Sequence, residues 1–214
     1  MSSYYDQTYY AWQKKAGLYG AVQDIWMYKP YIKPTDIVLD FGCGGGYMLH
    51  ELQCAKKIGV DINKAARNEA KRNGLIVFAG MSMIPTALKF STIISHHALE
   101  HVETPYEILN QIYRRLKIGG TFVCVVPIDD WRKEKKYIET DINKHLYTWT
   151  PLLIGNLFTR AGFTIKDIQI ITFAWLPLSR FYYRFIPAFI YKALGYFWSA
   201  WTNNRQIRIV AIRQ

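Results

Sequence analysis

Cysteine, acidic residues and long uninterrupted apolar runs are all scarce in this chain of 214 residues. Its three cysteines are odd in number and lack the paired spacing of metal sites, so they predict reduced thiols and exclude a disulfide framework. The first residues form no apolar signal segment, and we therefore expect a cytoplasmic protein. Because no repeat or low-complexity linker interrupts the chain, we expect one domain over residues 1–214.

The shortage of acidic residues is confined to the second part of the chain. Residues 1–130 contain 14 Lys and Arg against 12 Asp and Glu, whereas residues 131–214 contain 13 against 4. The net charges are therefore +2 and +9, which together make the +11 of the whole chain. A basic second part suggests an anionic partner, such as a phosphate-bearing small molecule, a sugar nucleotide or glycan precursor, a nucleic acid or a membrane surface. The alternative is a solvated basic surface that keeps the protein soluble.

The most informative stretch of the chain is an apolar run that ends in an acid and is followed by three alternate glycines. Residues 37–46 read IVLDFGCGGG. Glycine allows a tight turn and lets a ligand lie against bare peptide N–H groups. A second apolar run ends at Asp61, at about the spacing at which an acid meets a ribose hydroxyl. Asn63 is available to cap the following helix, which leaves Asp61 for a nucleotide-type ligand.

The arrangement of this loop favours one cofactor over another. The dinucleotide fingerprint is G-x-G-x-x-G, and it faces a pyrophosphate. Here the third glycine comes one residue early, and Asp40 precedes the loop. A carboxylate at this position suits a cationic ligand better than a phosphate, because like charges repel at short range. S-adenosylmethionine (SAM) carries a sulfonium and an ammonium group, and it is the cofactor that we predict.

Three segments of the chain resemble class I SAM-dependent methyltransferases. They read VLDFGCGGG at 38–46, GVDI at 59–62 and ISHHALEHV at 94–102. Within that family, the chain is similar to the bacterial methyltransferase-domain group often found with surface-glycan biosynthesis. The resemblance implies an α/β, Rossmann-like doubly wound sheet of about seven strands, with the last strand antiparallel.

The alternation of strand-like and helical runs also predicts a parallel sheet with helices on both faces. We expect a SAM-binding core over 37–130, preceded by an N-terminal helical region (1–36) and followed by a substrate side (131–214). Gly119–Gly120 is expected to end the helix before the fifth strand. The strands are expected at 37–41, 57–61, 75–78, 92–95, 121–126, 164–172 and 206–212.

An aromatic-rich insertion, residues 173–204, lies between the last two expected strands. It contains twelve Phe, Tyr and Trp residues together with Arg180, Arg184 and Lys192. These cations and Pro187 argue against a transmembrane helix. Two interpretations remain. We favour a helical lid packed on the core, and the alternative is an interfacial segment that inserts aromatic side chains into the inner face of a membrane.

The resemblance implies a cofactor site at the ends of successive strands. The backbone of residues 41–46 would hold the methionine part, Asp40 its ammonium group, Asp61 the ribose hydroxyls and Ile62 the adenine. The loop after the third strand lacks the acid that many relatives place at the adenine amino group, so Ser82 or a main-chain carbonyl is expected to replace it. The cofactor-binding candidates are Asp40, Phe41, Gly42, Cys43, Gly44, Gly46, Asp61, Ile62, Ser82 and His96.

Methyl transfer from a sulfonium to a hydroxyl needs an in-line geometry and removal of a proton. Residues 95–101 follow the fourth strand, at the carboxyl edge where open α/β sheets bind ligands. His96 is expected to contact the cofactor there through its backbone or ring. Imidazole has a near-neutral pKa, which suits proton removal. The candidate catalytic residues are His145, which we favour as the base, and His97, Glu100 and His101.

Other polar residues have expected roles on the substrate side. A structural role in holding its loop is as well founded for His101 as catalysis. Tyr147 should face the substrate, and Asp129 and Asp130 should orient substrate hydroxyls. We expect no metal site, because these two adjacent acids lack a third oxygen-ligand cluster.

Together these features predict a SAM-dependent methyltransferase that O-methylates a sugar hydroxyl in a glycan precursor or related small molecule, either sugar-nucleotide or lipid-linked. The alternatives are a methyltransferase acting on RNA, protein or lipid, and a non-catalytic SAM-binding or membrane-docking module. Residues 95–98 read SHHA in place of an Asn-Pro-Pro-Tyr-type loop, which counts against N-methylation of a base or of glutamine. A nucleic-acid partner is therefore disfavoured.

Overall fold

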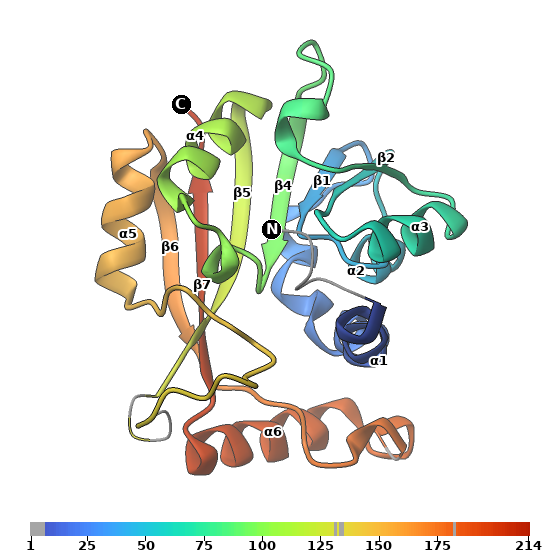
Figure 1. The fold of residues 1–214 in the computed structure, drawn as a ribbon, viewed down its shortest axis with the longest axis vertical. Coiled ribbons are helices and arrows are strands. Elements are labelled where there is room, and N and C mark those ends of the chain that lie inside the picture. The colour runs from blue at the N-terminus through green and yellow to red at the C-terminus, as the bar shows by residue number, and fades with distance from the viewer. Residues whose placement is uncertain (1–6, 131, 133–134, 182) are drawn as a thin grey trace.

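A computed structural model contains one seven-stranded sheet with helices on both faces (Figure 1). It describes residues 7–130, 132, 135–181 and 183–214. The strand order is β3-β2-β1-β4-β5-β7-β6. β7 runs antiparallel to both of its neighbours, and the other pairs are parallel, which confirms the predicted sheet. The strands are β1 (Ile37–Phe41), β2 (Lys56–Val60), β3 (Ile76–Phe78), β4 (Phe90–His96), β5 (Leu116–Ile128), β6 (Thr164–Ile171) and β7 (Arg205–Ile212).

The helices alternate with the strands as the sequence pattern predicts. Asn63 caps α3 by accepting the N–H groups of Ala65 and Ala66, and Thr150 caps α5 by accepting that of Leu153. Residues 1–6 of the expected N-terminal helical region lie outside the described part. The α-helices are α1 (Gln7–Asp24), α2 (Tyr47–Glu51), α3 (Lys64–Arg72), α4 (Pro105–Arg115), α5 (Pro151–Arg160) and α6 (Ala188–Thr202).

The expected helix stop at Gly119–Gly120 is wrong. α4 ends at Arg115, and the chain enters β5 directly at Leu116, whose side chain is fully buried. The Arg115 guanidinium donates hydrogen bonds to the carbonyls of Pro85 and Ile84, which fixes the helix end on the preceding loop. The two glycines instead lie in the irregular start of the strand, where the pairing of β5 with β4 shifts register.

Alternate residues of the central strands supply two separate cores. Val38 and Leu39 are both completely buried, but they point to opposite faces of the sheet. The face that carries Leu39 packs against α4 and α5, through residues such as Leu109 and Phe158. On the Val38 face lie α2 and the segment after α1, represented by Leu49. Burial on both faces is typical of a parallel sheet and explains why β1 and β4 carry apolar residues on both faces.

The carboxyl ends of β1, β4 and β5 meet at one edge of the sheet. Figure 1 shows α6 and the connection after β5 beyond this edge, with α1 beside it. The Tyr19 hydroxyl bonds to Ser179 and Tyr191 at 2.7 and 2.6 Å, and so joins α1 to the insertion. The N-terminal region and the insertion, far apart in sequence, therefore frame the same edge.

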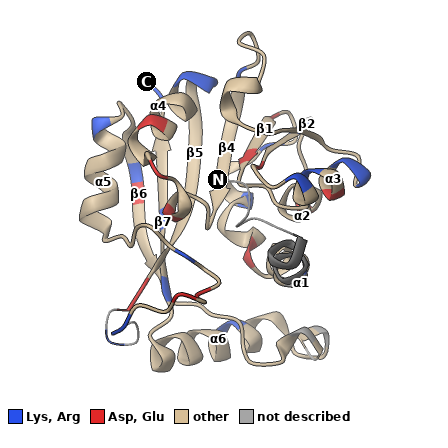
Figure 2. Ribbon diagram, in the orientation of Figure 1, with Lys and Arg blue, Asp and Glu red and all other residues tan. Residues whose placement is uncertain are grey.

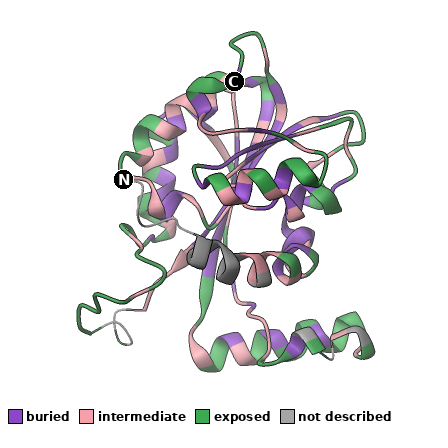
Figure 3. Ribbon diagram, turned by 45° about the vertical axis from the view of Figure 1, so that its right-hand side comes forward, coloured by how far each residue is buried: buried purple, intermediate pink, exposed green. Residues whose placement is uncertain are grey.

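The insertion contains the expected helix, α6, but this helix buries only a narrow stripe. Its buried residues are Tyr191, Gly195 and Ser199, spaced four apart on one side. Figure 3 shows most of the remaining surface of α6 as exposed. Within the described residues, no helix combines the length and apolarity required to cross a bilayer.

Candidate active site

The loop after β1 turns through three glycines in the left-handed region. The φ angles of Gly42, Gly44 and Gly46 are 81°, 53° and 80°. A Cβ on Gly42 would collide with the Cβ of Ala98, so this position requires glycine for packing as well as for conformation; a Cβ on Gly46 would displace the end of the Leu75 side chain. A Cβ on Gly44 would meet nothing within 4 Å. The backbone at Gly44 is therefore open to a ligand.

Asp61 follows β2 and stabilises this glycine loop directly. Its Oδ2 accepts the N–H of Gly44 at 2.8 Å, and its Oδ1 accepts the N–H of Asn63 at 2.7 Å. The carboxylate is 8% exposed. Burial raises its pKa, although the two backbone N–H donors act in the opposite direction. One acid thus links the two segments that the sequence pattern assigned to the cofactor.

Asp40, at the end of β1, is a buried carboxyl group. Its side chain is 3% exposed, and no described residue donates a hydrogen bond to it. Burial, and secondarily the charge of Asp61, raise the pKa of Asp40 to about 8. A cationic group placed beside it would reverse this shift. The open backbone at Gly44 and the buried acid at Asp40 both fit a ligand that carries an ammonium group.

The other cofactor candidates surround this loop. Ile62 is 66% exposed. Its side chain is therefore accessible to a flat ring such as adenine. Ser82 is exposed in a short turn, η3 (Met81–Met83), after β3. Cys43 is buried and packs beneath the loop, and Phe41 accepts a hydrogen bond from Ser95 through its carbonyl.

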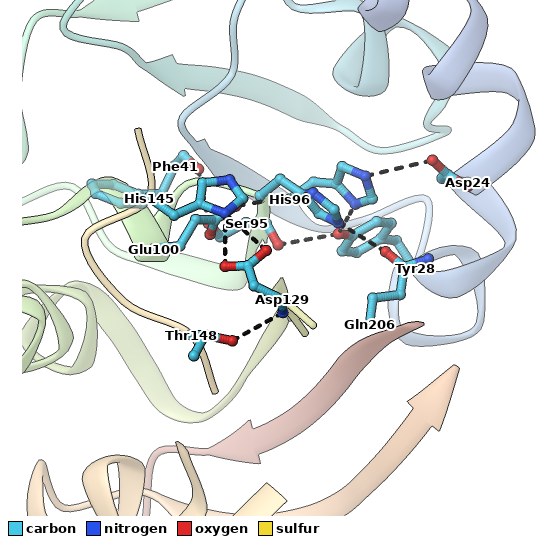
Figure 4. A network of polar contacts seen from close by, with 11 residues as sticks. Asp24, Tyr28, Phe41, Ser95, His96, Glu100, Asp129, His145, Thr148 and Gln206 are labelled. Atoms are coloured by element: carbon cyan, nitrogen blue, oxygen red, sulfur yellow. Dashed lines mark hydrogen bonds and ion pairs between the residues drawn. The ribbon is translucent and has the colours of Figure 1, made fainter. Parts of the chain in front are cut away.

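His96 is held by residues of the N-terminal region (Figure 4). Its Nδ1 lies 2.8 Å from the Tyr28 hydroxyl, and its Nε2 lies 3.5 Å from Asp24 Oδ2. The Tyr28 hydroxyl also donates to the Ser95 carbonyl. Sequence reasoning missed Asp24 and Tyr28, because neither belongs to a motif. The complete burial of Tyr28 is a tertiary property that the aromatic N-terminal segment did not reveal.

His97 adopts a left-handed backbone with a φ of 50°. Its N–H donates to the Val125 carbonyl, and its Nε2 lies 2.8 Å from Gln206 Oε1 on β7. Desolvation and the charge of the neighbouring His96 lower the pKa of His97 to about 3, and the two rings stack. Gln206, 109 positions away, is a further partner that the sequence did not indicate.

Three of the predicted catalytic side chains converge beyond the end of β4. Glu100 and His101 lie in a short turn, η4 (Leu99–His101), and the Glu100 carbonyl accepts the N–H groups of Leu146 and Tyr147. This backbone contact holds the segment around His145, which follows β5, against η4. As a result, one ligand-type atom from each of Glu100, His101 and His145 lies within 4.8 Å of the other two.

His145 lies beside Asp129, with one ring nitrogen within hydrogen-bond distance of both carboxylate oxygens. His145 Nδ1 lies 2.9 and 3.1 Å from the two Asp129 oxygens. Burial alone would lower the pKa of His145, but the hydrogen bond and charge of Asp129 outweigh it and the pKa is raised. Asp129 is fixed in turn, because its N–H donates to the Thr148 hydroxyl at 2.9 Å. Asp129 was predicted to orient substrate, whereas in the structure it orients His145 (Figure 4).

The two remaining substrate candidates lie outside this cluster. Asp130 pairs with Arg132 and accepts a hydrogen bond from Asn203 at the end of α6, and both contacts lower its pKa. The Tyr147 hydroxyl donates to the Glu103 carbonyl, and its ring stacks on Trp149. These hydrogen bonds of Asp130 and Tyr147 go to residues other than Glu100, His101 and His145.

Comparison with known proteins identifies the class that this fold and site define. Residues 13–168 match the family described as "Methyltransferase domain", so the chain belongs to that family. Its fold is that of class I SAM-dependent methyltransferases, and the predicted cofactor is that of the family.

Individual relatives are distant. The chain is 29% identical over 172 residues to the ubiquinone biosynthesis O-methyltransferase of Psychrobacter arcticus, which covers 68% of this chain and 65% of the relative. It is 27% identical over 128 residues to the enzyme of the same name from Roseobacter denitrificans, covering 53% and 49%. The matched region thus spans about half to two thirds of these relatives. A SAM-dependent methyltransferase structure from Archaeoglobus fulgidus aligns with a TM-score of 0.68 at 20% identity, covering 97% of this chain and all of that one.

Proposed function

We propose that the protein transfers the methyl group of SAM to a hydroxyl of a lipid-borne acceptor at a membrane surface. The observation that carries this proposal is the exposed apolar face of α6 beside the carboxyl edge of the sheet. The residues of that face, on α6 and just before it, and their exposed fractions are Phe185 85%, Phe189 75%, Ile190 39%, Leu194 43%, Phe197 67% and Trp201 79%.

This face lies opposite the buried stripe of α6. On a helix, Phe189, Phe197 and Trp201 point away from Tyr191 and Gly195. The side of the helix that faces away from the sheet is therefore apolar and aromatic. Large exposed aromatic faces mark contact with a partner or a membrane, and aromatic rings are stable at the membrane interface. α6 has 15 residues, which suits a helix lying in the interface.

The interfacial interpretation of the insertion now outweighs the lid interpretation favoured from the sequence. A lid would bury its aromatic rings against the core, whereas α6 buries Tyr191 and leaves Trp201 exposed. The Lys and Arg residues support an anionic partner less strongly than the charge count of the sequence suggested. Figure 2 shows Lys and Arg dispersed over α3, α5, β6 and α6, without a single concentration at the carboxyl edge.

The cofactor end of the site is assigned to the residues around Gly44. The Gly44 backbone and Asp40 would hold the amino-acid part of SAM, Asp61 its ribose, and Ile62 its adenine. SAM supplies a methyl group on a positively charged sulfur. The polar cluster of Glu100 and His145 would receive the acceptor hydroxyl, and its proton is lost there before or during transfer.

Two acceptor classes are consistent with this proposal. One is the sugar hydroxyl of a lipid-linked glycan precursor, which the sequence predicted. The other is a phenolic hydroxyl on a quinone-precursor lipid, since two relatives are named for ubiquinone biosynthesis. The names of these relatives favour the second class.

Radiolabelled SAM and the purified protein, incubated with vesicles that contain either lipid class, would test the proposal. We expect label in the lipid fraction, and more with the phenolic lipid. Label that enters only water-soluble small molecules, RNA or protein would contradict it. SAM binding without transfer to any acceptor pool would favour the non-catalytic module.

A further inference from the structure

The polar cluster beyond β4 has the composition of a metal-binding site. It presents one carboxylate and two imidazoles, from Glu100, His101 and His145, and their ligand-type atoms lie within 4.8 Å of one another. The rings of His101 and His145 meet edge to face, with centroids 5.0 Å apart and an interplanar angle of 67°. Their nitrogen lone pairs can therefore converge on one point from different directions.

The strongest indication is that the Glu100 and His101 atoms are buried and have no hydrogen-bond partner among the described residues. Glu100 is fully buried, and neither of its oxygens has a hydrogen-bond partner on another described residue. The buried Nδ1 of His101 likewise has no partner among the described residues. A buried polar group without a hydrogen bond is destabilising, and more so if it is charged. Such unpaired groups, converging in one place, call for a ligand that accepts several lone pairs.

The surrounding groups prepare the two imidazoles for such a ligand. Asp129 holds His145 through Nδ1, which leaves Nε2 as the free nitrogen. His101 hydrogen-bonds to the Lys144 backbone, and because its Nδ1 is unpartnered, Nε2 makes that bond. Metal-binding histidines almost always donate their second nitrogen to a carboxylate or backbone carbonyl in this way. Figure 4 shows the Asp129–His145 pair against Glu100.

An acid–base pair alone does not account for the cluster. A general base would need only His145 and its Asp129 partner. It would leave unexplained why Glu100 is placed at the same point with both oxygens unsatisfied. His97 Nδ1 approaches Glu100 Oε1 only to 3.9 Å, which is too long for a hydrogen bond.

We propose that Glu100, His101 and His145 bind a divalent transition-metal ion of the Zn²⁺ type, with Asp129 supporting His145 from outside the coordination sphere. Two imidazoles and one carboxylate match the ligand set of open zinc sites, which keep a further position for an exchangeable ligand. This departs from the sequence analysis, which predicted no metal. The ion is divalent and borderline-soft, as the mixed nitrogen and oxygen donors require.

The role of the ion rests on the proposed function. An acceptor hydroxyl in the open position would lose its proton to solvent more readily, because a bound cation stabilises the resulting oxyanion. That oxygen would then form the new bond to the methyl carbon. The carbon–sulfur bond breaks with its electron pair going to sulfur, which leaves the demethylated cofactor.

Equilibrium dialysis of the chelator-treated full chain against Zn²⁺ would test the site, with Co²⁺ absorption as a second readout. We expect one Zn²⁺ per chain, and tetrahedral-type Co²⁺ bands. Glu100→Gln should abolish this binding, and Asp129→Asn should weaken it about 10- to 100-fold. His50→Gln is the matched control, because His50 is 74% exposed and far from the cluster, and it should bind like wild type.

Calorimetric titration with SAM checks that each variant remains folded. If wild type fails to bind Zn²⁺, or if Glu100→Gln binds as wild type does, the metal site is wrong. Zn²⁺ binding without methylation of lipid-borne hydroxyls would overturn the proposed function and leave the metal site intact. Conversely, lipid methylation by a chain that binds no Zn²⁺ would overturn only the metal site.

Discussion

The two ends of the active site are built in different ways. At the proposed cofactor end, the site is formed by consecutive backbone atoms from Gly42 to Gly46, and Asp61, after the next strand, fixes this loop. At the acceptor end, side chains from η4, the end of β5 and the following segment meet across the edge of the sheet. The first arrangement depends on local conformation, and the second depends on the complete fold. Changes at the two ends should therefore have separable effects.

The largest effect is expected from Asp61→Asn at the cofactor end. The substitution removes the charge that accepts the Gly44 and Asn63 N–H groups and that would hold the ribose. Hydrogen bonds to charged groups contribute about 1.5–3 kcal/mol each, so SAM affinity should fall about 100-fold. Calorimetry would measure it, with Asp130→Asn as the control. Equal affinity in the two variants would remove Asp61 from the cofactor site.

Gly42→Ala should test whether the loop is fixed by packing or only by backbone conformation. Gly42 is left-handed, and a Cβ there collides with Ala98. Gly74 has a similar φ of 78° but open space around a Cβ. We expect Gly42→Ala to lower the free energy of unfolding by about 1–3 kcal/mol more than Gly74→Ala does. Urea denaturation would measure both, and equal losses would show that packing against Ala98 contributes nothing.

The exposed face of α6 gives an intermediate effect that should leave the cofactor end unchanged. Phe197→Ser with Trp201→Ser removes two exposed rings, so partition onto anionic vesicles should fall about tenfold or more. Ile118→Ser is the control, because Ile118 is 81% exposed at the opposite end of the sheet. Vesicle sedimentation would measure partition. The same loss in the control would mean that α6 has no special contact with lipid.

The effect of Asp40 should be visible mainly as a pH dependence of stability. Its pKa is raised from 3.8 to about 8, so the native chain keeps a proton that the unfolded chain has released. The resulting stabilisation is complete below about pH 4 and is lost as the pH rises through about 8. Asp40→Asn should flatten this part of the stability profile.

The same acid links SAM binding to proton release. An ammonium group beside Asp40 favours the carboxylate, so binding near pH 7 should release close to one proton from wild type and none from Asp40→Asn. Calorimetry in two buffers of different ionisation enthalpy would measure it. Equal proton release by the two proteins would place the ammonium group elsewhere.

The comparison also explains what the sequence could and could not predict. The glycine loop, Asp61 and the Asn63 cap are local signals, and the structure places them together as expected. Glu100 and His145 were both identified, but their convergence depends on backbone hydrogen bonds from Leu146 and Tyr147, which are 46 and 47 positions from Glu100. The contact of Asp129 with His145 was not predicted, for the same reason. Tyr28 and Gln206 carry no motif, and only the packed fold assigns them to His96 and His97.

A single titration tests the central claim, that the cofactor end is an autonomous SAM site to which the acceptor end is added. SAM would be titrated calorimetrically into wild type, Asp61→Asn and Glu100→Gln. We predict one SAM per chain for wild type, the same affinity for Glu100→Gln and a large loss for Asp61→Asn. No binding by wild type, or equal losses in both variants, would contradict the claim.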